Sequence, residues 1–222
     1  MNLEDELNTL SHVLNSKEIK CSNFLACLFQ NDGYFRSMQM NKKTIAIIAI
    51  IIVAALTRLI PHPMNFAPLG AMALFGSAYL GRKGVGLLVT MLAWMASDLI
   101  LNNLVYSTGG FTLFTDGAIF IYASIVLIYL LGTKLFSKVT ITRMLVGSLS
   151  ASLIFFIVSN FGVWAGGLMY PMSFDGLIAS YAAAIPFFQN TITGDLVYSV
   201  ALFIAYEKIF KAQLTAKKIE SE

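Results

Sequence analysis

The chain has 222 residues, of which 57% are hydrophobic and only 12% are charged. Soluble domains carry about 25% charged residues, so the composition excludes an ordinary soluble protein and predicts an all-α integral membrane protein. The net charge of +3 is too small to indicate nucleic-acid binding, and two cysteines (Cys21 and Cys27) are too few for a disulfide framework. We expect no metal and no cofactor.

Residues 1–39 form a polar leader. It begins with Glu4, Asp5 and Glu6, whereas a secretory signal peptide begins with basic residues. Leucines recur at the spacing of a short amphipathic cytoplasmic helix, at Leu3, Leu7, Leu10 and Leu14. The alternative is a start at Met38 or Met40, directly before the first apolar helix.

Apolar segments long enough to cross a bilayer follow within residues 40–211, which we treat as one transmembrane domain ahead of a cytoplasmic tail at 212–222. Prolines at 61, 63 and 68 end the first segment. The six predicted helices are, approximately, Thr44–Ile60, Phe66–Leu80, Val85–Leu101, Gly117–Phe136, Met144–Ala165 and Thr191–Phe210.

One further apolar piece, Leu177–Phe188, is too short to span and carries Pro186 near its end. It favours an interfacial or re-entrant helix before the last span. A seventh span would also move the lysines of the tail to the outer side, against the usual placement of basic residues.

The lysines and arginines predict the orientation of the six helices. They lie before the first helix, in the second and fourth connectors and in the tail, whereas the third and fifth connectors have none. Because cytoplasmic loops are enriched in basic residues, both chain ends are predicted to be cytoplasmic. The expected location is the bacterial inner (plasma) membrane.

Charged and amide side chains gather near the outer ends of these helices. A charge in hydrocarbon costs about 2.5–3.5 kcal/mol, so such residues normally face a cavity or the bundle interior. Arg58 is expected to pair with Asp98 or Asp195. Charges, amides and flat aromatic walls together are typical of ligand pockets. The predicted substrate-binding residues are Arg58, His62, Asn65, Trp94, Asp98, Asn102, Asn160, Trp164, Asn190 and Asp195.

Two purely structural interpretations, which involve no ligand or partner protein, remain open for the charged and the small residues. The charged residues can be snorkelling groups or helix-packing ion pairs without a ligand. The small residues of the second and fifth helices, such as Gly70, Gly76 and Gly147, are explained by close helix packing inside the bundle.

Several motifs resemble those of a family of bacterial six-helix membrane proteins between about Arg58 and Phe203. They are Arg58-Leu-Ile-Pro-His-Pro-Met-Asn-Phe-Ala-Pro-Leu-Gly, Ser97-Asp98-Leu99, Asn160-Phe-Gly-Val-Trp164, Tyr170-Pro171 and Ala184-Ile-Pro-Phe-Phe-Gln-Asn-Thr-Ile-Thr-Gly-Asp195. That family looks related to the substrate-binding (S) components of energy-coupling-factor vitamin transporters.

This resemblance implies uptake of a small vitamin-like or cofactor-precursor molecule from the outer side. It also implies partners on other chains, namely a coupling membrane subunit and ATPase subunits. The chain departs from S components on the first helix, where Ile50 and Val53 interrupt the usual Ala-x-x-x-Ala seam. A solitary carrier is therefore also open. The chain has no Walker-type phosphate-binding motif of its own.

Two rival functions come from other classes. A membrane scaffold or assembly subunit would be a cavity-free bundle in which Asp98 and Asp195 are both neutralised internally. An intramembrane aspartyl enzyme would need two carboxylates that share a proton, but Ile192 stands where the Gly-x-Gly-Asp motif of such proteases requires glycine. We expect no enzymatic activity.

Overall fold

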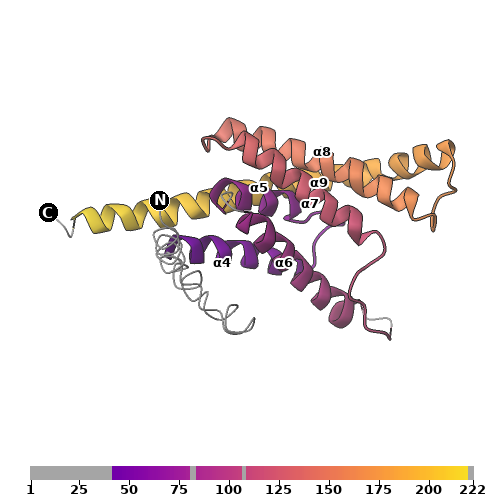
Figure 1. The fold of residues 1–222 in the computed structure, drawn as a ribbon, viewed down its shortest axis with the longest axis horizontal. Helices are drawn as coiled ribbons and strands as arrows, with labels where there is room; N and C mark the ends of the chain where they lie inside the picture. The colour runs from indigo at the N-terminus through magenta and orange to yellow at the C-terminus, as the bar shows by residue number, and fades with distance from the viewer. Residues whose placement is uncertain (1–41, 81–83, 107–108, 220–222) are drawn as a thin grey trace, which may run out of the picture. The chain divides into compact units, whose positions relative to one another are not determined.

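The computed structural model describes residues 42–80, 84–106 and 109–219, with side chains up to residue 208. The predicted leader, residues 1–39, lies outside them. Every regular element within these ranges is helical, which confirms the all-α class for this part of the chain. Six α-helices run in the order α4 (Lys42–Leu56), α5 (Leu69–Leu80), α6 (Val85–Ile100), α7 (Ala118–Leu135), α8 (Ile141–Ala165) and α9 (Phe174–Ile219) (Figure 1).

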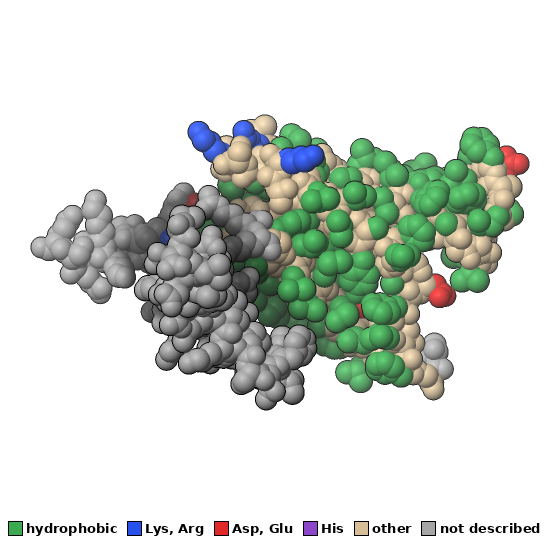
Figure 2. Space-filling model, in the orientation of Figure 1, with side chains coloured by type: hydrophobic (Ala, Val, Ile, Leu, Met, Phe, Trp, Pro, Cys, Tyr) green, Lys and Arg blue, Asp and Glu red, His purple; other side chains and the backbone are tan. Residues whose placement is uncertain are grey.

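Three of the described helical segments are long and apolar enough to cross a membrane. They are Val85–Val105, which adds a π-helical turn to α6, Ala118–Leu135 and Ile141–Ala165. Large apolar side chains cover their outer faces, among them Leu88, Leu127 and Leu149 (Figure 2). A soluble bundle would bury such a continuous apolar surface, whereas lipid solvates it.

The helices alternate in direction, so their connectors gather at two ends of the bundle. The α4–α5, α6–α7 and α8–α9 connectors lie at the long-connector end. The end of α5, the start of α6 and the α7–α8 connector lie at the opposite, short-connector end. Lys134 is in the last turn of α7, Lys138 is in the α7–α8 connector and Arg143 is in the first turn of α8. Figure 2 shows Lys and Arg side chains gathered at one end of the visible face.

The last helix differs from the sequence prediction. Leu177–Phe188 is not a separate interfacial or re-entrant helix, because α9 runs without interruption for 46 residues and extends into the predicted tail. Pro186 removes one backbone donor, but the turns on either side remain helical. At 1.5 Å per residue α9 is about 69 Å long, roughly twice the thickness of a hydrocarbon core.

The short helix α5 is the centre of the bundle. Ten of its twelve residues are buried, and it contacts α4, α6, α7, α8 and α9. It starts at Leu69 rather than at the predicted Phe66, because residues 60–68 are non-helical and carry three prolines. At about 18 Å it covers little more than half of a hydrocarbon core.

Glycines allow the helices to approach α5 closely. A Cβ atom on Gly86 of α6 would overlap the carbonyl of Gly76 on α5, and one on Gly132 of α7 would overlap Ser77 Oγ. These contacts agree with the packing interpretation of the small residues. On the short-connector side, rings of α5, α7 and α9 fill the core, namely Phe75, Tyr79, Phe136, Phe203 and Tyr206.

Gly86→Ala should destabilise the protein by forcing α6 away from α5. Overpacking of this kind costs about 1–3 kcal/mol, so the thermal unfolding midpoint in detergent should fall. Gly110→Ala is the matched control, because a Cβ there meets no atom within 4 Å. Equal midpoints for the two variants would contradict the close α5–α6 contact.

Candidate functional site

A nearly buried ion pair joins the 3-10 turn after α4 (Thr57–Leu59) to α6 at the long-connector end. Arg58 Nη1 lies 2.7 Å from Asp98 Oδ1 and donates a 2.6 Å hydrogen bond to Ser97 Oγ. The guanidinium also lies 3.6 Å from the ring centroid of Trp94. The side chains of Arg58 and Asp98 are only 13% and 15% exposed. Of the two partners that the sequence allowed for Arg58, the structure selects Asp98.

Asp195 is held separately, against the start of α5. Its carboxylate accepts hydrogen bonds from the Ala71 backbone N–H (3.2 Å) and from Ser152 Oγ (2.8 Å). The first N–H groups of a helix have no partner within the helix and carry a partial positive charge. A carboxylate from α9 therefore caps α5 across the core. Gly70 leaves room for it, since a Cβ there would lie 2.6 Å from both carboxylate oxygens.

The proline-rich loop at residues 60–68 is fastened to α9. Asn190 Nδ2 donates a 3.0 Å hydrogen bond to the carbonyl of Met64. Gly194 lets the backbones come close, because a Cβ there would lie 3.2 Å from Ala67 N and 3.3 Å from Phe66 Cα. Asn65 has a positive φ of 63°, a conformation that asparagine tolerates better than most residues.

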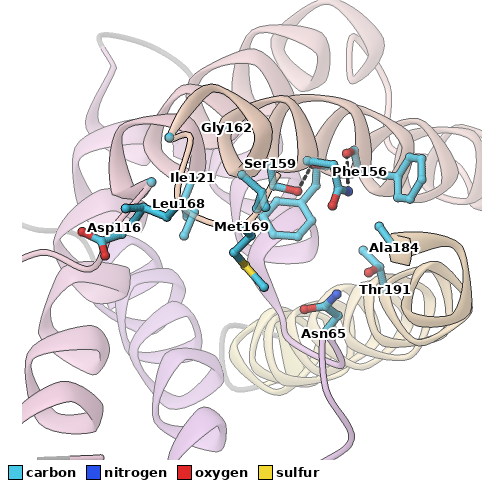
Figure 3. Close-up of a pocket in the computed structure, with 15 residues that line it drawn as sticks. Asn65, Asp116, Ile121, Phe156, Ser159, Gly162, Leu168, Met169, Ala184 and Thr191 are labelled. Carbon is cyan, nitrogen blue, oxygen red and sulfur yellow. Dashed lines mark hydrogen bonds between the residues drawn. The ribbon is translucent and has the colours of Figure 1, made fainter. Parts of the chain in front are cut away.

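Two adjoining cavities open beside this loop. The larger, of about 470 Å³, lies between the loop, α7, α8 and α9 (Figure 3), and the smaller, of about 240 Å³, lies between the loop, α6 and the start of α5. Both are lined by Asn65, Ile121, Phe155 and Thr191.

Six of the ten predicted site residues line these cavities. The smaller cavity takes Arg58, His62, Asn65, Trp94 and Asp195, and the larger takes Asn65 and Asn160.

The other four predicted residues lie outside the lining, and three of them support the walls. Asp98 holds Arg58. Trp164 Nε1 donates to the carbonyls of Pro171 and Ser173 and so ties α8 to the connector before α9. Asn190 ties down the loop. Asn102, in the π-helical turn, lines neither cavity.

Sequence reasoning missed several lining residues of the larger cavity. Asp116, near the end of the α6–α7 connector, lies at the rim of the larger cavity. Ser159 lines the cavity next to Asn160, and Phe156 and Met169 give it apolar surface (Figure 3). Thr191 lies one turn before Asp195 on the same face of α9. This spacing was the one sequence signal that could have identified a further lining residue. The remaining side chains become neighbours only through tertiary packing.

Three buried polar atoms near this end have no hydrogen-bond partner within the described part of the chain. They are Trp94 Nε1, Asn102 Nδ2 and the Tyr122 hydroxyl. Leaving such a group unsatisfied costs about 1–3 kcal/mol. They are therefore places where a water molecule or a ligand atom would gain a hydrogen bond.

A third cavity, of about 660 Å³, lies at the short-connector end. Its described lining comes from α4, α5, the start of α6, α7 and the α7–α8 connector, and it includes Thr44, Tyr79 and Ser137 but no charged side chain. The candidate site is therefore the pair of cavities at the long-connector end.

The chain belongs to a family of unknown function, DUF6580, whose model matches residues 38–217. The matched region contains α4 to α8, α9 up to residue 217 and every residue of the candidate site. No curated protein and no solved structure matches the chain.

Asp98→Asn should destabilise the protein by about 3–5 kcal/mol, because it leaves the guanidinium of Arg58 without its carboxylate in a nearly buried place. The double variant Arg58→Met/Asp98→Leu removes both charges and should be more stable than Asp98→Asn. Unfolding midpoints in detergent measure this order. If Asp98→Asn matched the parent chain, the pair would have no structural role.

Asp195→Ala should cost more stability than Ser152→Ala. The serine change removes one hydrogen bond, worth about 1 kcal/mol, whereas loss of the carboxylate also leaves the Ala71 N–H without an acceptor. Asp195→Asn keeps an oxygen acceptor and should fall between the parent chain and Asp195→Ala. The reverse order of Asp195→Ala and Ser152→Ala would contradict the capping role.

Proposed function

We propose that this protein is a multi-pass protein of the bacterial plasma membrane that binds a small vitamin-like or cofactor-precursor molecule from the outer side for uptake. The observation that carries the proposal is the pair of adjoining cavities at the long-connector end. The larger cavity, of about 470 Å³, is in the volume range of small-molecule sites, and the smaller, of about 240 Å³, adjoins it. Apolar and aromatic walls with a few converging polar groups are the usual composition of such sites.

The proposed topology has six spans and both chain ends in the cytoplasm. Exposed basic side chains stand at the short-connector end, whereas the exposed Asp116 and Asp175 belong to the long-connector end (Figure 2). Basic residues favour the cytoplasmic side, so the two cavities would face outward. The short α5 fits a span if the non-helical loop before it is sheltered from lipid by protein or by a water-filled cavity. Residues 66–68 of this loop are half-buried or buried, whereas residues 61–65 are exposed beside the cavities.

A scaffold or assembly subunit without substrate is the second candidate. Its support is that Asp98 and Asp195 both have partners inside the protein, which a purely structural role would also need. A cavity-free bundle was the other expectation of that interpretation, and the two cavities count against it. Binding therefore explains more of this end of the bundle.

An intramembrane aspartyl enzyme gains no support from the geometry. Asp98 faces the guanidinium of Arg58, whereas Asp195 faces Ser152 and the start of α5. Two carboxylates that share a proton must lie side by side. The described contacts give each of them a different set of partners.

Coupling to a membrane subunit and ATPase subunits is proposed from the S-component resemblance alone. On α4, Ile45, Ile52 and Val53 are exposed, and Ala49 is exposed between them. This face carries branched side chains rather than a seam of small residues. A solitary carrier therefore stays the alternative to a shared energising module.

Ala184→Trp tests the binding site directly. Ala184 lines the larger cavity, so an indole there should fill it and abolish ligand retention (Figure 3). The protein would be purified in mild detergent from its own host and analysed by native mass spectrometry. A co-purifying small molecule should be present on the parent chain and absent from the variant.

Ala183→Trp is the matched control, because its side chain is exposed and outside the cavity lining. It should keep the co-purifying molecule. A parent chain that carries no small molecule from its own host, although folded, would favour the scaffold. Equal loss from both variants would show that retention does not depend on the cavity.

A further inference from the structure

The charges at the long-connector end are strongly unbalanced. Among the described side chains, Arg58 is the one lysine or arginine at this end, whereas Asp98, Asp116, Asp175 and Asp195 all lie there. The remaining described basic side chains are at the other end of the bundle, at Lys43, Lys134, Lys138, Arg143 and Lys208. Figure 2 shows the same separation on one face. The long-connector end is therefore electronegative.

The imbalance extends into the two cavities. Arg58 is already paired with Asp98 at 2.7 Å. Asp195 lines the smaller cavity and has two neutral partners, the Ser152 hydroxyl and the Ala71 N–H. Asp116 lines the larger cavity at its rim. These carboxylates give the cavities a negative electrostatic potential, which the low-dielectric walls strengthen. A negative potential concentrates cations in the cavities and repels anions.

A second observation points to a ligand atom inside the smaller cavity. Trp94 lines it and is only 4% exposed, and its Nε1–H interacts with the nearby Asp98 carboxylate without making a hydrogen bond of normal length and angle within the described residues. The indole can only donate. A ligand with an acceptor atom, such as a carbonyl oxygen or a ring nitrogen, would satisfy it.

The lining favours an organic molecule over a bare metal ion. Phe155, Phe156 and Met169 give the larger cavity apolar walls. Within the described residues, no group of three or more His, Cys, Asp and Glu side chains is placed to hold a metal ion. The space and the walls suit a ring or short chain attached to the charged group.

We propose that the two cavities take a small organic cation, with its positive nitrogen toward Asp195 or Asp116 and an acceptor atom toward the Trp94 N–H. This inference deepens the proposed function and rests on it. It excludes anionic substrates such as carboxylates and phosphates.

Fluorescence of Trp94 measures the sign of the field. The chain has two tryptophans, and Trp164 lines neither cavity, so the Trp164→Phe variant leaves Trp94 as the one emitter. Its emission would be titrated in detergent micelles with CsCl, NaI and neutral acrylamide at matched ionic strength. Relative to their quenching of free N-acetyltryptophanamide, caesium should quench Trp94 at least about fivefold more efficiently than iodide, since a local potential of one kT already separates opposite ions by that order.

Matched variants connect this preference to the cavity. Asp116→Asn and Asp195→Asn, each added to Trp164→Phe, should bring the caesium-to-iodide ratio closer to one. Asp175→Asn removes an exposed carboxylate that is not part of the lining and should change the ratio less. A larger effect of Asp175→Asn than of the other two would overturn the assignment.

Benzyltrimethylammonium then tests the ligand class, with phenylacetate as a probe of similar size and opposite charge. The cation should protect Trp94 from acrylamide at least about fivefold better than phenylacetate does, because the same field acts on both. Protection by phenylacetate, or by neither probe, would overturn the inference.

The outcomes separate this inference from the proposed function. Equal quenching by caesium and iodide, together with a co-purifying molecule that Ala184→Trp removes, would defeat the cation inference and leave binding intact. No quenching even by acrylamide would show that Trp94 borders no accessible cavity and would count against both.

Discussion

The buried start of α5 is the constraint on which the rest of the structure depends. A helix that begins inside an apolar bundle leaves N–H groups that neither water nor lipid can satisfy. Here the carboxylate of Asp195 accepts from Ala71, and Ser152 in turn donates to that carboxylate. One cap thus fixes α5, α8 and α9 relative to one another. Gly70 is required at the contact because a side chain there would displace the carboxylate.

The cavities follow from the same arrangement. The short α5 begins only at Leu69, and the non-helical, proline-rich loop connects the end of α4 to it. Space is left on both sides of Asn65, toward α6 on one side and toward α8 on the other. The Arg58–Asp98 pair then closes the wall on the α6 side. Capping, loop and cavities are in this sense one structural unit.

Basic and acidic side chains are separated between the two ends of the bundle. Basic side chains stand at the short-connector end, and the carboxylates are concentrated at the other. The same bias that would orient the helices in a membrane also leaves the cavity end, within the part of the chain that the structure describes, without lysine or arginine apart from Arg58, which is already paired. A field that favours cations is thus a consequence of topology as well as of the site residues.

The sequence by itself determined the helical class, the approximate bounds of most helices and the bias of basic residues, because each follows from local composition and the length that a bilayer imposes. It also placed Arg58, Asn65 and Asp195 near one end. Only the tertiary structure decided that Arg58 pairs with Asp98, that Asp195 caps α5, that α9 runs through Pro186, and that Asp116 and Thr191 line a cavity with Asn65. Those outcomes depend on contacts between residues far apart in the chain, 124 positions for Ala71 and Asp195, which no local pattern records.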